Sequence, residues 1–574
     1  MATAAVDRPD GPLTHKQIVT ILIGLMMGMF LAALDQTIVA TAIRTIADDL
    51  KGLNEQAWAT TAYLITSTIV TPLYGKLSDI YGRKPFFITA ISIFIFGSIL
   101  CTFADSMFQL AAYRAVQGLG AGGLFSLALA IIGDIVPPRE RAKYQGYFLA
   151  VFGTSSVLGP VIGGFFAGTD TILGIDGWRW VFLVNVPIGA AALAVVSKTL
   201  HLRHTRLDHR IDWWGAAALS ASLVPLLIVL EQGREWGWGS TASLTCFAIG
   251  TVAAVAFFLI ERAMGEEAIL PLGLFRIRTV GVASVASVII GVAMFGGLAS
   301  LPLYLQIVKG ATPTQAGLLL LPMTLGIMAG SIGSGVAIAK TGRYRHFPVT
   351  GAALLTLSLF VFHYVQADTP LWQVMIVMVF FGIGLGFNFQ PLTLAVQNAV
   401  RPQEIGVATS TATFTRQIGG TIGTAVFLSI LFSTVPDKIA SAMQRIAPTP
   451  DFQAALKDPA NAEFAQQFAQ AQQSGGAASA SGVLKDSSFL TDLDPRLAKP
   501  FLEGFSDSMD LVFLVGACVM VFGFLVLLLL PHVELRSGSA YSERGQADAD
   551  ARAEAEARAE GRAEAPAGAQ TPPL

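Results

Sequence analysis

The chain has 574 residues, of which 53% are hydrophobic and only 13% are charged. Soluble globular proteins carry about 25% charged residues, so this composition excludes a soluble enzyme: the chain has too few polar groups to cover the surface of a protein this long. The formal net charge of −2 also excludes a polybasic protein that binds nucleic acid.

About fourteen apolar stretches follow one another along the chain, each near the 20 or so residues that cross a bilayer as a helix. The first has no small-residue cleavage site and is therefore expected to be retained. These stretches predict an all-α, multi-pass membrane protein with about fourteen transmembrane helices. In chain order they lie at 17–43, 56–75, 86–104, 107–133, 144–168, 179–197, 212–231, 242–262, 279–308, 314–339, 347–366, 371–397, 404–433 and 508–531.

Lysine and arginine gather in the short links that follow the second, fourth, sixth, eighth and tenth stretches, and they are scarce in the alternate links. Basic links stay on the cytoplasmic side of a membrane. This alternation predicts that both termini are cytoplasmic and that the chain resides in a plasma (inner) membrane.

Several glycine and arginine positions recur at one constant offset of 260 residues, which predicts two six-helix bundles in the same orientation. In transporters with such repeats the substrate site lies between the halves. The recurring pairs are Gly75/Gly335, Gly82/Gly342, Arg83/Arg343, Gly122/Gly382, Gly159/Gly419 and Gly163/Gly423.

The repeat divides the chain into five segments. We expect a cytoplasmic segment at 1–16, a first bundle at 17–197, two inserted helices with their linkers at 198–278, a second bundle at 279–531 and a disordered cytoplasmic tail at 532–574. Within the second bundle, residues 434–507 are rich in Ala, Gln and Ser and are expected to form a long extracytoplasmic loop.

Two opposite charges fall inside the first bundle. Asp35 and Arg114 lie in the first and fourth stretches, both roughly 10–12 Å below the outer ends by helical rise. An intramembrane charge costs at least about 2.5 kcal/mol, so it is a candidate functional group. We expect the two to share a water-filled cavity and to take part in proton coupling. The alternative is an interfacial aspartate and an arginine that ties helices together.

The link at 75–84 carries the residues of a possible gate. Gly75 and Gly82 permit close approach and an unusual backbone conformation, Asp79 is suited to pair with a basic group or a helix end, and Arg83 adds a positive charge. We interpret these four residues as conformational gating residues. Plain electrostatic anchoring on the cytoplasmic side is the alternative.

Polar groups in the second bundle are candidates to line a substrate cavity. Arg416 lies near mid-membrane with no acidic residue within a helical turn, so either an anionic substrate or backbone carbonyls must satisfy it. Asn388 and Gln390 are candidate cavity walls. Three charges at the inner end of the fourth stretch are interpreted as a solvated cluster, namely Asp134, Glu140 and Arg141.

Five segments together resemble motifs of the major facilitator superfamily. Residues 75–84 are similar to its loop signature, 114–123 to the fourth-span motif associated with proton coupling, and 153–164 to the fifth-span motif of its antiporters. Residues 34–39 and 177–187 resemble signatures of the fourteen-helix drug:proton antiporters. Gln36 and Gln117, inside these motifs, are further cavity candidates.

The chain departs from the family at two positions: Ile80 replaces a basic residue, and Arg44 stands where the family usually has proline. In the fifth-span motif, proline removes a backbone donor and glycines permit close approach of helices. We therefore expect a bend and a packing seam between the halves, although ordinary close packing is the alternative. We interpret the residues concerned as further conformational gating residues, namely Gly159, Pro160, Gly163 and Gly164.

The sequence contains no nucleotide-binding loop, metal-ligand cluster or nucleophile constellation. With the resemblance, this predicts a bacterial drug:proton antiporter that needs no cofactor. It would use the proton gradient to expel amphipathic, cationic or neutral compounds by alternating access, and loop 434–507 is a possible site for a cell-envelope partner. Three alternatives are a same-fold exporter of a lipid or endogenous metabolite, a non-transporting membrane sensor and, with less support, a membrane-embedded enzyme.

Overall fold

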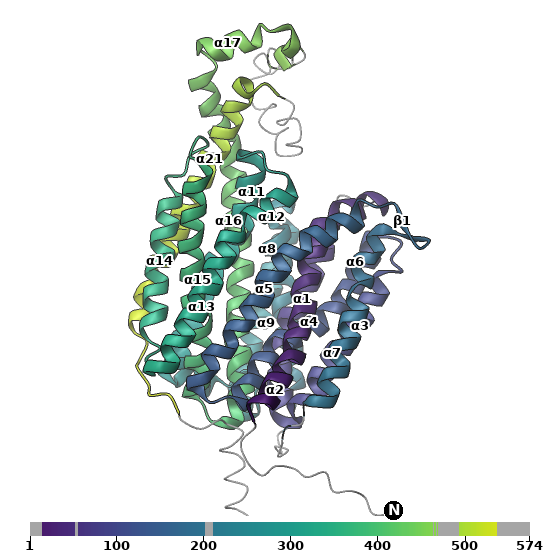
Figure 1. Ribbon diagram of the computed structural model, residues 1–574, viewed down its shortest axis with the longest axis vertical. Helices are drawn as coiled ribbons and strands as arrows, with labels where there is room; N and C mark the ends of the chain where they lie inside the picture. The colour runs from purple at the N-terminus through teal and green to yellow at the C-terminus, as the bar shows by residue number, and fades with distance from the viewer. Residues whose placement is uncertain are drawn as a thin grey trace, which may run out of the picture.

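The computed structural model describes residues 14–51, 55–200, 202, 211–462, 464–466, 468 and 493–536. These residues form a bundle of long, nearly parallel helices, with a smaller helical extension at one end (Figure 1). The strands in the described part are the two-residue pair β1 (Thr171–Ile172) and β2 (Ile175–Asp176), which form an antiparallel hairpin.

The helices fall into three groups in chain order. The first group is α1 (His15–Asp49), α2 (Gln56–Tyr81), α3 (Arg83–Cys101), α4 (Met107–Ile135), α5 (Pro138–Ala167), α6 (Trp180–Leu183) and α7 (Asn185–Thr199). The inserted group is α8 (Trp213–Trp236), α9 (Thr241–Met264) and α10 (Leu272–Arg276). The last group is α11 (Arg278–Leu303), α12 (Pro313–Leu319), α13 (Leu321–Thr341), α14 (His346–Phe362), α15 (Leu371–Ala399), α16 (Ile405–Ile446), α17 (Pro450–Leu456) and α21 (Pro495–Leu528).

The same helix pairs pack against one another in the first and last groups. In the first group α1 packs on α5, α2 on α4, and α3 on both α4 and α7. In the last group α11 packs on α16, α13 on α15, and α14 on both α15 and α21. The two groups therefore repeat one helical arrangement. The prediction of an all-α multi-pass fold with two six-helix bundles and two inserted helices is confirmed.

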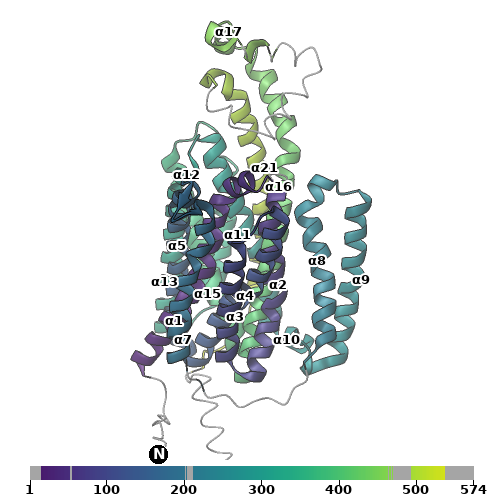
Figure 2. The same cartoon turned by 90° about the vertical axis from the view of Figure 1, so that its right-hand side faces the viewer.

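The inserted pair stands beside the bundles rather than within either one. Figure 2 shows α8 and α9 as a separate hairpin, and α8 packs on α2 and α16. The helix α9 exposes a row of large apolar side chains that includes Leu244, Val252 and Phe258. Such a surface suits contact with lipid tails.

Eleven helical segments in the described part are long and apolar enough to cross a membrane, and the shorter apolar helices Val151–Ala167 and His346–Phe362 accompany them. The helix α2 has 26 residues, which at about 1.5 Å per residue also exceeds a bilayer core. Its threonine and serine residues lower its hydropathy. The first helix, α1, runs without interruption through Arg44 to Asp49.

Local sequence signals explain several helix ends. The Thr14 hydroxyl and the Gln17 side chain form a reciprocal capping box at the start of α1. Gly82, between α2 and α3, has φ 102°, and Gly342, its counterpart after α13, has φ 69°. Residues other than glycine rarely adopt a positive φ, so both repeated positions favour glycine, although Gly82 has ψ 154° and Gly342 has ψ 0°.

The region predicted as a loop at 434–507 is partly helical, which corrects the expected boundaries. The helix α16 has 42 residues and α21 has 34, far more than the 20 or so that a bilayer requires. Both run on past the bundle and carry α17 at their outer ends (Figure 1). Val435, Ile439, Ala442 and Ile446 are buried along α16, a helical spacing that a search for purely apolar stretches overlooks.

A short stretch of the predicted tail is also ordered against the bundle. The Asn398 side chain donates to the Glu534 carbonyl (2.9 Å) and accepts from the Arg536 amide (3.1 Å). Arg536 in turn donates to the Val400 carbonyl. Residues up to 536 are therefore bound at the junction between α15 and α16. The rest of the predicted tail lies outside the described residues, as do residues 1–13 of the predicted N-terminal segment.

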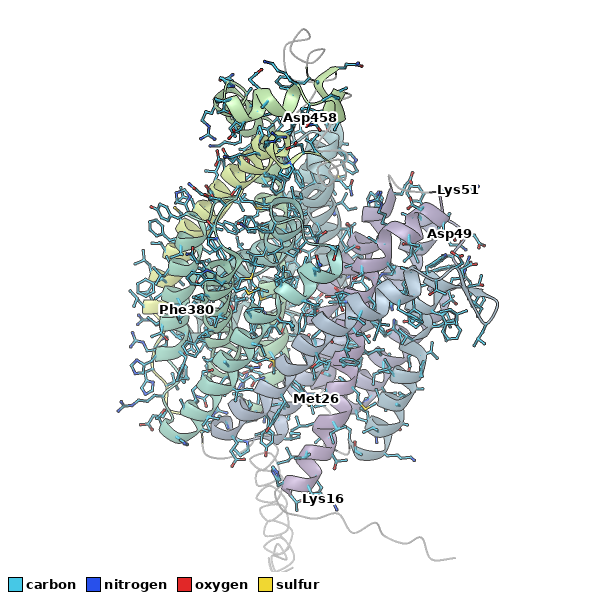
Figure 3. All side chains as sticks on the ribbon, turned by 45° about the horizontal axis from the view of Figure 1, so that its top comes forward. Lys16, Met26, Asp49, Lys51, Phe380 and Asp458 are labelled. Atoms are coloured by element: carbon cyan, nitrogen blue, oxygen red, sulfur yellow. The ribbon has the colours of Figure 1, made fainter. Side chains whose placement is uncertain are left out.

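Both ends of the described chain lie at one end of the bundle, here called the termini side. Figure 3 places Lys16 there, Asp49 and Lys51 at the opposite end of α1, and Asp458 in the outer extension. The ribbons of the two halves diverge toward that opposite end (Figure 1).

The repeated glycines provide a test of this packing. A Cβ added at Gly122 meets the carbonyl oxygen of Ser67, and one added at Gly382 meets that of Met323, whereas one added at Gly333 meets nothing within 4 Å. We expect G122A and G382A each to lower the free energy of unfolding by about 1–3 kcal/mol because the helices must separate. The control G333A should leave it unchanged or raise it, since alanine favours a helix. Thermal unfolding in detergent measures this, and equal stabilities of all three variants would contradict the packing.

Candidate functional site

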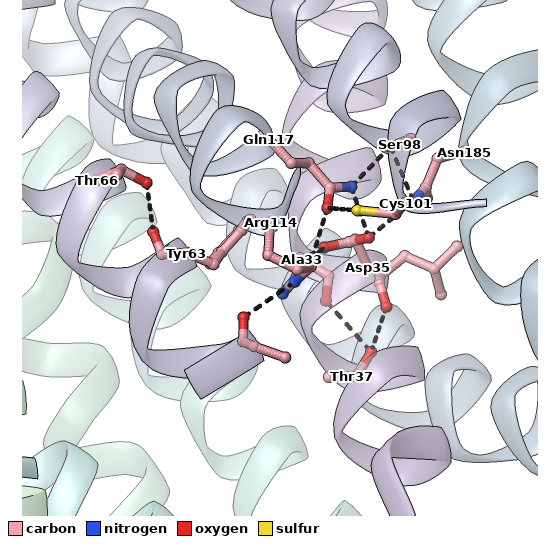
Figure 4. Close-up of polar contacts among 12 residues, drawn as sticks. Ala33, Asp35, Thr37, Tyr63, Thr66, Ser98, Cys101, Arg114, Gln117 and Asn185 are labelled. Atoms are coloured by element: carbon pink, nitrogen blue, oxygen red, sulfur yellow. Dashed lines mark hydrogen bonds and ion pairs between the residues drawn. The ribbon is translucent and has the colours of Figure 1, made fainter. Parts of the chain in front are cut away.

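The carboxylate of Asp35 is the centre of a buried polar cluster in the first half (Figure 4). Its Oδ2 accepts from Arg114 Nη1 at 2.5 Å, forming an ion pair. Its Oδ1 accepts from Gln117 Nε2 at 2.9 Å and from Asn185 Nδ2 at 2.8 Å. Asp35 has 0% of its surface exposed. The three donors satisfy a charge that would otherwise be very costly in this environment.

Gln117 joins the members of this cluster. Its amide nitrogen also donates to Ser98 Oγ (2.7 Å), and its amide oxygen accepts from Arg114 (2.7 Å). The guanidinium of Arg114 lies 4.1 Å above the ring of Tyr63, a favourable contact between cation and aromatic ring. The cluster therefore draws on α1, α2, α3, α4 and α7, so a change in the charge of Asp35 acts on five helices.

The structure differs from the water-filled cavity expected around this pair. Asp35 and Arg114 do lie at one depth, but both side chains are buried and in direct contact. Gln117, a predicted cavity residue, is fully buried and bonded through both amide atoms. In this conformation the cluster is sealed.

A second charged cluster joins the two halves at the termini side. Asp79, at the end of α2, accepts from the backbone amides of Gly406 (3.2 Å) and Val407 (2.7 Å) in the first turn of α16. A carboxylate stabilises this end of a helix through the free amides and the helix dipole. Nearby, Gly75 approaches Ser410 so closely that a side chain would collide with it.

Arg83 holds Asp79 in place from within the first half. It forms ion pairs with Asp79 (2.5 Å) and Asp134 (2.8 Å), and all three side chains are buried. Three of the gating candidates, Gly75, Asp79 and Arg83, thus meet at one contact between α2, α3, α4 and α16, and Gly82 joins α2 to α3.

The cluster predicted to be solvated at the inner end of α4 is largely buried, which corrects that interpretation. Asp134 pairs with Arg83, and Arg141 donates to Gln397 of the other half (2.9 Å) and to the carbonyls of Gly133 and Val136. Only Glu140 of the three is exposed. Asp134 and Arg141 belong to the contact between halves because α15 and α16 cover them.

The fifth-span residues face three directions. Gly159 and Gly163 pack against Thr37 and Ile38 of α1, so the glycine seam lies inside the first half and not between the halves as expected. Pro160 contacts the position of Gly317 in α12, across the halves. Gly164 is exposed, and a Cβ added there meets nothing within 4 Å, so close packing does not require a glycine at this position.

The cavity candidates of the second half differ in their surroundings. Asn388 is buried against Gly351 of α14 and donates to the Gly384 carbonyl. Gln390 is also buried, so neither lines open space in this conformation. Gln36 is half-buried next to Asp35. The guanidinium carbon of Arg416 lies 3.7 Å above the ring of Phe389.

Sequence reasoning missed some of the residues that hold Asp35. Asn185 lies within the signature at 177–187 but was not assigned a role, and Ser98 lies in an otherwise apolar stretch. For both Asn185 and Ser98, the signal available in the sequence was a polar residue inside an otherwise apolar stretch. The signal for Asp134 was its position between Ile132 and Ile135, since an isolated charge among large apolar residues is more often buried with a partner than solvated.

Two repeated helical bundles joined by a charged contact at one end are the arrangement of a secondary transporter. The comparison with protein families matches residues 25–424 to the Major Facilitator Superfamily. The chain belongs to this family. Its members are transporters and not enzymes, as predicted.

Curated relatives place the chain near multidrug transporters. Multidrug resistance protein 3 of Bacillus subtilis is 36% identical over 435 residues, covering 75% of this chain and 83% of the relative. The multidrug transporter MdtP of Bacillus subtilis is 34% identical over 414 residues, covering 72% and 75%. An uncharacterized MFS-type transporter of Mycobacterium tuberculosis is 34% identical over 531 residues, covering 92% and 72%. The predicted membership of the superfamily is confirmed, and two of these relatives are named as multidrug proteins.

Solved structures support the fold. The proton:xylose symporter XylE aligns with a TM-score of 0.56 at 14% identity, covering 93% of this chain and 99% of its own. A bacterial homologue of the lysosomal transporter Spinster aligns with a TM-score of 0.54 at 15% identity, covering 92% and 100%.

The contact of Asp79 with α16 predicts how its loss affects the termini side. D79N removes the charge that binds Arg83 and the first turn of α16. We expect this to weaken closure by about 1–2 kcal/mol, or roughly tenfold in the open population. A cysteine at position 410, in a chain whose Cys246 and Cys518 are replaced by alanine, reports opening through its rate of reaction with an impermeant maleimide.

The matched control is E140Q, which removes an exposed carboxylate from the same side. We expect no change in labelling rate. Equal rates in D79N and the parent chain would show that Asp79 does not hold the gate.

Asn185 predicts a measurable coupling with Asp35. N185A removes one of the two donors to Oδ1, so we expect a loss of about 1–3 kcal/mol in unfolding free energy. The loss should be smaller in a D35N background, where the charge is absent. A double-mutant cycle on thermal or denaturant unfolding measures the coupling. Additive losses would mean that Asn185 acts only through packing.

Proposed function

We propose that this transporter exports amphipathic drugs or toxic compounds in exchange for protons, using the proton gradient and no cofactor. One observation carries the proposal: a buried carboxylate, Asp35, is paired with Arg114 inside a membrane helix. Ionisable residues in such positions mark ion pathways and proton relays. The names of the curated relatives supply the substrate class.

In the proposed cycle the conformation described here holds Asp35 deprotonated, with the termini side closed by Asp79. Proton uptake neutralises Asp35 and removes the partner of Arg114. Breaking a buried ion pair in this way costs about 3–5 kcal/mol. A cost of that size changes a conformational equilibrium by more than roughly 100-fold. Binding of one proton is therefore sufficient to favour a rearranged cluster and to reorient the halves.

The proposal requires a conformation in which Asp35 becomes accessible, because its carboxyl has no exposed surface here. We expect an apolar carbodiimide, which reacts with protonated carboxyls, to label Asp35 at acid pH, and bound substrate to slow the labelling. A carboxyl that no pH, substrate or gradient makes reactive would have no route to either compartment, and antiport through it would be excluded.

We place the chain in the plasma membrane of a bacterium with both termini in the cytoplasm. The alternating distribution of basic links supports this orientation, and the relatives include bacterial proteins. The gate at Asp79 then closes the cytoplasmic side. The envelope partner expected at 434–507 stays a prediction. The described part of this region has a small core of its own, to which Phe452 and Leu497 contribute.

The central prediction concerns D35N. This variant keeps the shape of the side chain but cannot exchange a proton, so we expect substrate efflux driven by a pH gradient to fall at least tenfold, the size of effect that about 1.4 kcal/mol produces. Proteoliposomes with an imposed gradient measure the flux directly, and they also distinguish a transporter from a non-transporting sensor.

The control is D48N, which removes an exposed carboxylate from the outer end of the same helix. It should transport like the parent chain. Full proton-dependent efflux by D35N would refute the role of Asp35.

A further inference from the structure

Arg416 has unusual surroundings among the buried cations of the described residues. Arg83 and Arg114 pair with carboxylates, and Arg141 donates to carbonyls and an amide. Lys76 donates to the carbonyl of Glu266. Arg416 is 7% exposed, and within the described part of the chain no hydrogen bond or ion pair reaches its guanidinium.

The surroundings of Arg416 leave this charge uncompensated. Its guanidinium lies over the Phe389 ring at 3.7 Å, which offsets only part of the cost of removing a cation from water. A guanidinium has five N–H donors, and the ring face satisfies none of them by a conventional hydrogen bond. A buried, unpaired cation of this kind is expected to be completed by an anion from outside the chain.

The helix packing holds Arg416 in position. The glycines that follow it, Gly419 and Gly420, press α16 against Val288 and Phe295 of α11. Next to Arg416 in the chain, Gln417 accepts a hydrogen bond from Thr71 of α2 (3.2 Å). Arg416 thus lies on a helix that contacts both halves, at the level where α16 meets α2.

We infer that Arg416 and Phe389 form an anion-recognition subsite, and that the preferred substrates are amphipathic compounds carrying a carboxylate beside an aromatic or apolar body. A carboxylate accepts two parallel hydrogen bonds from a guanidinium, and the Phe389 ring offers an apolar surface to the rest of the molecule. This inference rests on the proposed function, because it treats the bound compounds as substrates of transport. It replaces the expected preference for cationic or neutral compounds.

Three fluorescent probes that share one ring system test this preference. They are dansylglycine, which is an acid, dansylglycinamide, which is neutral, and monodansylcadaverine, which is a cation. Titration of each into the full chain in lipid nanodiscs, without a pH gradient, gives three dissociation constants. We expect the acid to bind at least about tenfold more tightly than the amide, because the free energy of one charge-assisted hydrogen bond corresponds to about that ratio of dissociation constants.

Substitutions at Arg416 then identify the group responsible. R416Q should weaken binding of the acid by about tenfold or more and change binding of the amide by less than about twofold. R416K should keep part of the preference, since it keeps the charge but not the fork of donors. The control R44Q, which removes an exposed arginine from the other half, should leave all three constants unchanged.

Several outcomes would overturn the inference. For the parent chain these are equal binding of acid and amide, a preference for the cation, and no saturable binding of the acid up to its solubility limit. For R416Q they are an acid preference that survives the substitution and an equal loss of binding for all three probes. The last would show a structural role for Arg416.

Flux under an imposed pH gradient separates this inference from the proposed function. If no gradient drives transport of any probe while Arg416-dependent binding of the acid persists, antiport fails and the subsite stands. If proton-driven export is observed without a charge preference, the subsite fails and antiport stands.

Discussion

A carboxylate inside a membrane helix is stable only while other groups satisfy its charge, and this requirement organises the first half of the protein. Asp35 needs Arg114, Gln117 and Asn185 at one depth, so α1, α4 and α7 must keep a fixed relation along their length. The small residues of α4 permit this, because Gly118 and Gly122 bring it against the backbone of α2. Close packing and charge compensation therefore depend on each other. If the helices separated, the donors and the acceptor would be exposed at the same time.

One helix, α16, connects the features that a transport cycle must coordinate. Its first turn donates to Asp79, and Arg416 is the twelfth of its 42 residues. Its outer part continues beyond the bundle to the packed extension with α21 (Figure 1). A continuous helix transmits displacement along its axis with little loss. Under the proposed function, release of the first turn at the termini side therefore moves the region around Arg416 as well, without any separate relay between them.

Much of this arrangement follows from the sequence because hydropathy and glycine spacing act locally. The helical stretches, the repeat and the common depth of Asp35 and Arg114 needed only helix geometry. Partners far apart in the chain could not be assigned, and Asn185 and Gln397 show why: their positions beside Asp35 and Arg141 depend on how distant helices pack. The outer extension escaped detection for another reason, because the buried positions of α16 beyond the bilayer alternate with polar ones and lower the average hydropathy.

The repeat also shows what the two halves do not share. Backbone demands recur at an offset of 260 residues, as at Gly82 and Gly342, but the charges do not: Asp35 corresponds to Phe295 and Arg114 to Val374. The first half thus holds a buried charge, Asp35, that Arg114 compensates. The second holds Arg416, which has no compensating group in the described chain. Under the proposed function Asp35 is the site that loses its charge and Arg416 is the site that gains a partner, and the duplicated scaffold places these two sites on different halves.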